Sequence, residues 1–187
     1  MVRIITGEAK GKKLVTLEGD ATRPTSDRIK GAMFSSLQFD IENRRVLDLF
    51  AGSGQLGLEA MSRGAECVTF VDSAREAMEV VKENARKTGY FDRSRFSVSD
   101  WRNYIRKASG RERFDLVFID PPYSMECCVE AAERLAAAEL IIPGALLVPE
   151  CGTEAVDPTA LPGFEVIKSA SYGKKTSLHI LIYRGRE

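Results

Sequence analysis

The residues with the most chemical content are Asp120-Pro121-Pro122-Tyr123, which follow an apolar run at 114–119. A buried strand that ends in this way places a carboxylate, a stiff turn and an aromatic ring at one point. Each proline fixes its own φ, lacks an N–H and restricts the preceding residue, so the carbonyls of the turn are held rigid. The Asp120 carboxylate and one carbonyl can accept both N–H bonds of an exocyclic amine, while Tyr123 offers a stacking face for a base. We therefore predict that these four residues form a catalytic site for a flat, amine-bearing group.

A glycine-rich turn lies upstream, after the strand pattern of residues 45–50. Gly52–Gly57 matches G-x-G-x-x-G at the start of a helix pattern, and such glycines allow a tight turn and close backbone approach to a ligand. Asp72 ends the next strand, where an acid can accept bonds from both ribose hydroxyls. Asp100 ends the third strand, where it can accept from an adenine amino group, and Trp101 beside it can cover the ring. This combination predicts a bound adenosine-type cofactor.

Two cofactors fit that pattern, a nicotinamide dinucleotide and S-adenosylmethionine. Asp48, inside the end of the first strand, favours the second. A carboxylate there would repel a pyrophosphate, whereas it can meet the positively charged amino group of the methionine part, directly or through water. A nicotinamide enzyme also has no need of Asp-Pro-Pro-Tyr.

Strand and helix patterns alternate along most of the chain, which predicts an α/β fold with a doubly wound, mostly parallel seven-stranded sheet. A closing hairpin with so short a link must be antiparallel. We expect a small N-terminal hairpin and helix extension at residues 1–40 and one main domain at 41–187. Ser73 and Glu76 have the spacing of a helix capping box, and Pro143-Gly144 is typical of a turn. The expected strands are 45–50, 67–71, 95–98, 114–119, 145–150, 164–171 and 176–183, and the expected helices are 27–37, 55–63, 73–88, 102–108 and 125–140.

The composition is that of an ordinary globular protein, with 44% hydrophobic and 29% charged residues. No apolar run reaches membrane-spanning length and no leader pattern opens the chain, so we expect a cytoplasmic protein. The four cysteines lack metal-ligand spacing, and no metal site is predicted. A formal net charge of zero argues against coating nucleic acid by bulk electrostatics, although residues 1–30 hold seven basic side chains against four acidic ones.

At these residues the chain resembles the RsmD family of small-subunit ribosomal RNA guanine-N2 methyltransferases, which have a Rossmann-like class I methyltransferase fold. The resemblance covers nearly the full length. It includes the opening Arg3–Gly7 with Gly11–Leu14, the segment Arg23–Arg28, the run Leu47–Gly64 and the Asp-Pro-Pro-Tyr turn. The cofactor-binding residues that we expect are Asp48, Phe50, Ala51, Gly52, Ser53, Gly54, Asp72, Ser73, Asp100 and Trp101.

The resemblance implies transfer of a methyl group from S-adenosylmethionine to the N2 amine of a guanine in 16S ribosomal RNA, within the small subunit or its assembly intermediate. The N-terminal segment would close over the cofactor or touch RNA. The basic residues and one hydroxyl that we expect at the RNA are Lys10, Lys12, Lys13, Arg23, Thr25, Arg28, Lys174 and Lys175. Because Asp-Pro-Pro-Tyr is shared with adenine-N6 methyltransferases, that activity is an alternative. A non-catalytic adenosyl-binding assembly factor and a nicotinamide oxidoreductase are two others.

Overall fold

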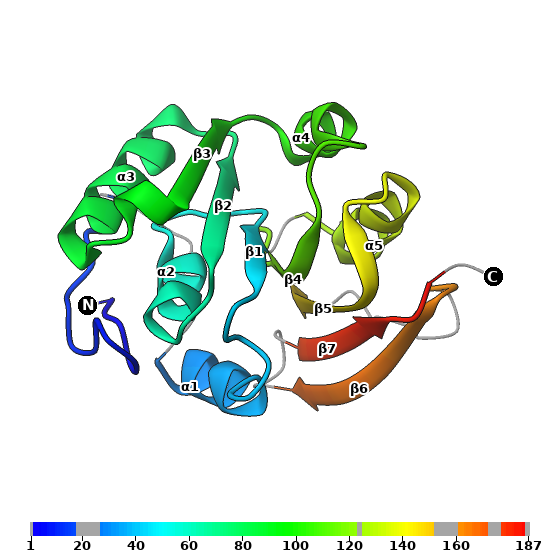
Figure 1. Ribbon diagram of the computed structural model, residues 1–187, viewed down its shortest axis with the longest axis horizontal. Coiled ribbons are helices and arrows are strands. Elements are labelled where there is room, and N and C mark those ends of the chain that lie inside the picture. Colours follow the sequence, from blue (N-terminus) through cyan, green and yellow to red (C-terminus); the bar gives the residue numbers. More distant parts are fainter. Residues whose placement is uncertain (1, 18–26, 123–124, 152–160, 172–176, 186–187) are drawn as a thin grey trace.

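A computed structural model describes residues 2–17, 27–122, 125–151, 161–171 and 177–185 (Figure 1). Its centre is a seven-stranded sheet in the order β3-β2-β1-β4-β5-β7-β6. The first five strands are parallel, and β7 lies antiparallel between β5 and β6. The strands are β1 Arg45–Asp48, β2 Cys67–Asp72, β3 Ser94–Val98, β4 Phe114–Ile119, β5 Ile141–Cys151, β6 Phe164–Ser171 and β7 Ser177–Tyr183. The predicted α/β fold and seven-stranded sheet are confirmed.

Helices cover both faces of the sheet, as the alternating pattern predicts (Figure 1). They are α1 Asp27–Ser36, α2 Gln55–Ser62, α3 Arg75–Thr88, α4 Trp101–Ala108 and α5 Cys128–Ala137, with a 3-10 turn at Phe91–Arg93. The side chains of α1, α2 and α3 join one buried cluster and those of α4 and α5 join another. With both faces covered, most residues of the central strands β1, β2 and β4 are buried and apolar, which is typical of parallel sheets.

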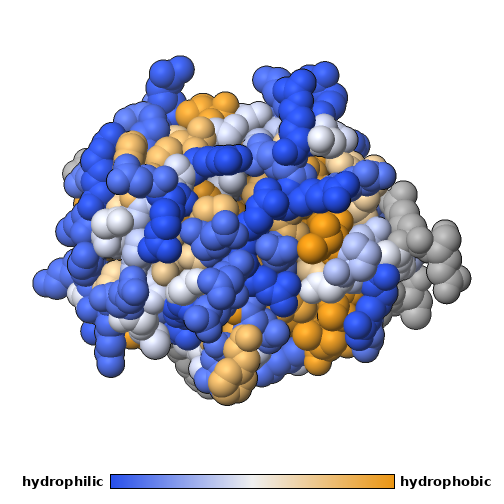
Figure 2. Space-filling view, viewed as in Figure 1, coloured by the Kyte–Doolittle hydropathy of each residue, from blue (hydrophilic) through white to orange (hydrophobic). Residues whose placement is uncertain are grey.

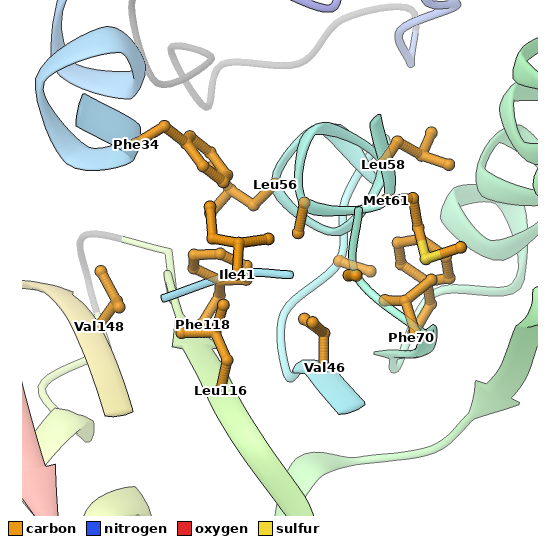
Figure 3. Close-up of a cluster of buried hydrophobic side chains, with 14 of the residues drawn as sticks. Phe34, Ile41, Val46, Leu56, Leu58, Met61, Phe70, Leu116, Phe118 and Val148 are labelled. Atoms are coloured by element: carbon orange, nitrogen blue, oxygen red, sulfur yellow. The ribbon is translucent and has the colours of Figure 1, made fainter. Parts of the chain in front are cut away.

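The core on the α1–α3 face is built from side chains of several elements that meet over the sheet (Figure 3). Phe34 of α1 packs against Phe118 of β4 with ring centroids 5.5 Å apart. Each such buried apolar side chain contributes ~1.5–3 kcal/mol to stability. Gly57 of α2 lies so close to the sheet that a Cβ there would come within 2.4 Å of the Phe70 ring. The third glycine of the motif therefore serves helix–sheet packing, and the other two serve the turn.

The N-terminal segment forms the predicted small hairpin, with an antiparallel bridge between Arg3 and Lys13. It packs into the same core cluster as α2. Glu59 of α2 is fully buried and accepts the backbone N–H groups of Ile5 and Thr6, at 2.7 and 3.0 Å. The Lys30 ammonium, also fully buried, lies 3.8 Å from the same carboxylate. Burying these charges is tolerated because each has charged or hydrogen-bonding partners. The domain boundary at residue 40 stays a prediction.

Three local predictions are corrected by the structure. Ser73 does not cap α3, because Ala74 occupies the N-cap position and makes no side-chain cap. Pro143 and Gly144 lie inside β5, where the pairing register with β4 shifts between Phe114 and Leu116 and absorbs the left-handed Gly144. The helix expected at 125–140 begins only at Cys128 and ends at Ala137.

The face seen in Figure 2 is mostly hydrophilic, and its apolar residues form small patches among polar ones. Within the part of the chain that the structure describes, no helix has the length and apolar character needed to cross a membrane.

Candidate active site at the carboxyl ends of the strands

A cavity of about 280 Å³ opens where the glycine turn after β1 meets the ends of β2 and β4. This volume is near the lower limit for small-molecule sites. The cavity brings together residues that were predicted from separate strands, because the carboxyl ends of parallel strands meet at one edge. Its lining comprises Thr16, Leu17, Asp48, Leu49, Phe50, Ala51, Gly52, Ser53, Gln55, Leu56, Asp72, Ser73, Ala74, Ala77, Ser99, Asp100, Trp101, Asp120, Pro121, Pro122 and Met125.

The glycine turn is shaped by left-handed backbone at Gly52 and Gly54, with φ of 53° and 78°. The Gly54 N–H donates to the Ala51 carbonyl at 2.6 Å, which closes the turn. The Gly52 N–H donates to Asp72 Oδ2 at 2.9 Å. A side chain at either glycine would be strained, so the sequence requires glycine here for backbone conformation.

Asp72 is fixed by two backbone donors, because its other oxygen accepts the Ala74 N–H at 2.9 Å. This bond lies just before α3 and holds the chain at the end of β2. Each carboxylate oxygen has two acceptor positions, so Asp72 can hold the turn and still accept a ribose hydroxyl. Ser73 lies exposed beside it at the rim of the cavity.

Asp48 is the buried acid of the site, with 1% of its surface exposed. Its Oδ2 accepts the Gly57 N–H at 3.0 Å. Burial raises the pKa of Asp48 to about 7; the Gly57 bond opposes that rise, and the nearby Asp120 and Asp72 add to it. Three acids around one cavity favour a ligand that brings positive charge.

Asp120 is half-buried, and its residue lines the same cavity as the glycine turn. Strands β1 and β4 are neighbours, and the Leu49 N–H donates to the Phe118 carbonyl at 3.1 Å. Pro121 is buried and Pro122 exposed. The Pro122 carbonyl accepts the Met125 N–H at 2.8 Å, which closes the turn. Tyr123 lies outside the described residues.

Asp100 has a role beyond the predicted one. Its carboxylate accepts the backbone N–H groups of Arg102 and Asn103, at 3.0 and 3.3 Å, and caps α4. Trp101 lines the cavity but is only 3% exposed, and its ring packs against Phe50 with centroids 6.1 Å apart. Trp101 therefore offers little surface to an adenine ring in this conformation, although both residues lie at the predicted place.

The residues predicted at the RNA are only partly described. Lys10 and Lys13 are exposed. The Lys12 ammonium donates to the carbonyls of Lys87 and Thr88, at 3.3 and 3.1 Å, and so stabilises the end of α3. The structure includes Arg28 within α1 but does not describe its side chain. Arg23, Thr25, Lys174 and Lys175 lie outside the described residues.

Several cavity residues were missed from the sequence, among them Thr16, Leu17, Gln55 and Met125. Thr16 and Leu17 belong to the N-terminal segment, which was predicted to close over the cofactor or touch RNA without any single cofactor-contacting residue being named. Among the described residues, no group of three or more His, Cys, Asp or Glu side chains could hold a metal.

Comparison with known proteins decides the family. A family model described as Conserved hypothetical protein 95 matches residues 2–182. This chain belongs to that family, which is the RsmD family. Its relatives include Ribosomal RNA small subunit methyltransferase D of Haemophilus influenzae, 33% identical over 86% of this chain and 83% of the relative. The Escherichia coli (strain K12) protein of the same name is 32% identical over 84% of this chain and 78% of its own length.

A solved structure of the Escherichia coli protein yhhF superposes with a TM-score of 0.88 at 28% identity, covering 99% of both chains. The RsmD family and this fold confirm the prediction of a class I methyltransferase that uses S-adenosylmethionine. The residues present fit that cofactor, because its sulfonium and ammonium groups supply the positive charge that Asp48, Asp72 and Asp120 favour.

Proposed function

We propose that this RsmD-family protein methylates the exocyclic N2 of a guanine in 16S ribosomal RNA. The observation that carries the proposal is the shared cavity: Asp120 and its proline turn open onto the space lined by the glycine turn. The two relatives named above are both called ribosomal RNA small subunit methyltransferases, and these names support a ribosomal RNA substrate in the small subunit. The RNA would be presented within the small subunit or an assembly intermediate.

In this proposal the cofactor is held by side chains that already have fixed positions. Asp72 would accept bonds from the ribose hydroxyls while its bonds to Gly52 and Ala74 keep it in place. Asp48 would face the ammonium of the methionine part. Phe50, Ala51, Ser53, Gly54, Ser73, Asp100 and Trp101 would complete the cofactor site. S-adenosylmethionine supplies an electrophilic methyl group on a sulfonium sulfur.

The end of β4 would prepare the nucleophile. A guanine amine is a poor nucleophile because its lone pair is delocalised into the ring. The Asp120 carboxylate and a carbonyl of the turn would accept its two N–H bonds and favour a pyramidal nitrogen whose lone pair points at the methyl group. We assign the second acceptor to the Pro121 carbonyl, which directly follows Asp120, whereas the Pro122 carbonyl already accepts one bond from Met125. Formation of the N–C bond, with loss of the C–S bond to the sulfonium sulfur, would require the nitrogen to lose a proton, and Asp120 would accept it.

The base must leave its stack to reach this turn, at a cost of a few kcal/mol. Tyr123 would offer a stacking face for it. Catalysis is then mainly positioning, which can contribute ~7–11 kcal/mol to lowering the barrier. We keep Lys10, Lys13, Arg23, Thr25, Arg28, Lys174 and Lys175 as proposed RNA contacts.

The test is transfer of labelled methyl groups to small subunits that lack the modification, followed by nucleoside analysis. We expect N2-methylguanosine in 16S RNA. N6-methyladenosine would indicate the adenine alternative, because the same acceptor pair can hold any exocyclic amine. Absence of any product, with binding of S-adenosylhomocysteine retained, would indicate a non-catalytic binding factor.

A further inference from the structure

One polar side chain, Asn84, lies on the buried face of α3. It is fully buried, and it follows Val81 by three residues on the same apolar face. Burying an amide costs several kcal/mol unless its hydrogen bonds are made. A polar residue at such a position therefore needs partners, and the partners of Asn84 come from two distant parts of the chain.

The Asn84 amide makes three hydrogen bonds. Its Oδ1 accepts the Val15 N–H at 2.8 Å. Its Nδ2 donates to the Val15 carbonyl and to the Ser53 carbonyl, both at 2.9 Å. The donor and acceptor pattern of the two backbones admits only this orientation of the amide. Asn84 thus pairs with Val15 as a neighbouring strand would, and it holds the glycine turn with the same group.

Both hydrogen-bond partners of Asn84 belong to segments that line the cavity. Ser53 is part of the glycine turn and lines the cavity itself. Val15 directly precedes Thr16 and Leu17, which line another part of it. A Cβ on Gly54 would lie 3.2 Å from Val81, so α3 also packs directly against the glycine turn. One face of α3 therefore supports two parts of the cavity lining.

We propose that Asn84 is a positioning residue for the cofactor site, which ties the segment Val15–Leu17 to the glycine turn so that both shape the cavity together. The proposal rests on S-adenosylmethionine as the cofactor and does not depend on guanine as the substrate. A ligand in the cavity contacts both the glycine turn and the segment Val15–Leu17. Docking of the segment therefore strengthens ligand binding, and ligand binding strengthens docking of the segment by the same free energy.

Hydrogen exchange on the unmodified protein gives the first test. Saturating S-adenosylhomocysteine should slow exchange of the Val15 amide by about tenfold or more. The reason is that opening of the segment would then also require the ligand to lose its contacts with it. Unchanged exchange at Val15–Leu17 on binding would overturn the proposal, and this measurement needs no variant.

Substitution gives the second test. Asn84→Leu keeps the branched shape of the side chain but removes all three bonds, and Asn84→Asp keeps only the acceptor for Val15. Each should raise the Kd for S-adenosylhomocysteine about tenfold, measured by calorimetry well below the unfolding temperature. Thr88→Val is the matched control, since among the described residues the buried Thr88 hydroxyl bonds only to the carbonyls of Asn84 and Ala85 in its own helix. A Kd equal to that of the control would contradict the proposed role.

A double-mutant cycle separates positioning from general destabilisation. Leu17→Ala should weaken binding of S-adenosylhomocysteine severalfold in the original chain and hardly at all in Asn84→Leu, because the segment is then already released. Additive effects would refute the coupling. These measurements contain no RNA, so their failure leaves the guanine assignment standing, and a wrong nucleoside product would leave the role of Asn84 standing.

Discussion

The two halves of the cavity gain their rigidity in different ways. In the cofactor half, acids and an amide are bonded to backbone groups: Asp72 to Gly52 and Ala74, Asp48 to Gly57, and Asn84 to Ser53. In the acceptor half, after β4, two prolines fix the backbone covalently. The rigidity of the cofactor half therefore depends on side-chain hydrogen bonds, which single substitutions can remove. We therefore expect changes in the cofactor half to act on binding and changes at Asp120 to act on turnover.

The largest expected effect is at Asp120. Asp120→Ala should lower kcat by about 10²–10³-fold, because one of the two positioned acceptors is lost. The Kd for S-adenosylhomocysteine should stay nearly unchanged. Asp120→Asn keeps an acceptor oxygen and should retain more activity than the alanine variant. Glu126→Gln removes a charge just after the same turn and serves as the control. If Asp120→Ala had the same kcat as Glu126→Gln, the acceptor half would not be the part of the cavity that controls turnover.

The next effect concerns pH and Asp48. Because its pKa is about 7 when folded and near 4 when unfolded, the native state holds the proton more tightly. Stability should therefore fall as pH rises from about 4 to 7, by at most ~4 kcal/mol. Asp48→Asn should lose this part of the pH dependence and have the higher Tm at pH 8. A parallel Tm profile for the two proteins would contradict the raised pKa.

Binding should depend on Asp48 in the opposite direction. The cofactor ammonium favours the carboxylate, so the affinity for S-adenosylhomocysteine should increase as pH rises through about 7. In Asp48→Asn it should be weaker and should change little between pH 6 and 8. Calorimetry at several pH values measures both. An affinity that rises equally in both proteins would show that another group titrates.

A smaller effect, mainly on stability, is expected at Gly57. Gly57→Ala would place a Cβ 2.4 Å from the Phe70 ring and 2.8 Å from Val68, which should cost ~1–3 kcal/mol. Gly31→Ala is the matched control in α1, since nothing lies within 4 Å of its Cβ position. It should be neutral or stabilising by ~0.5–1 kcal/mol. Equal unfolding free energies for the two variants would refute the close packing of α2 on the sheet.

The smallest effects separate neighbouring lysines. In a plot of the logarithm of the RNA-binding constant against the logarithm of salt concentration, Lys13→Gln should reduce the slope by about one unit. That is the change expected for one lost phosphate contact. Lys12→Gln should leave that slope unchanged and lower stability by ~0.5 kcal/mol, because Lys12 bonds to the end of α3. Filter binding at several salt concentrations measures the slopes. A lower slope for Lys12→Gln would indicate that Lys12 also contacts RNA.

The sequence could predict what depends on local pattern and on the general geometry of parallel sheets. The bounds of β4 and the meeting of Asp48, Asp72 and Asp120 at one cavity follow from these. It could not predict bonds to distant backbone groups. Asn84 depends on Val15 and Ser53, far away in the chain. The cap that Asp100 makes on α4 is local, and there two roles compete for one residue, since Asp100 also has the pattern of a ligand acid.

A signal for Asn84 was nevertheless present in the sequence. It is a polar residue on a largely apolar helix face, and a buried amide needs hydrogen-bond partners. Gly144 gave a misleading signal in the opposite sense. The Pro143-Gly144 pair suggested a turn, but the register shift between β4 and β5 accommodates the left-handed Gly144 within a strand.

The most direct test of the shared cavity is the identity of the nucleoside that the protein makes. Small subunits lacking the modification would be incubated with saturating S-adenosylmethionine and either the original chain or Asp120→Ala, and the 16S RNA would be analysed by mass spectrometry. We predict N2-methylguanosine with the original chain and almost none with the variant. A methylated adenosine, or equal product from both proteins, would contradict the account.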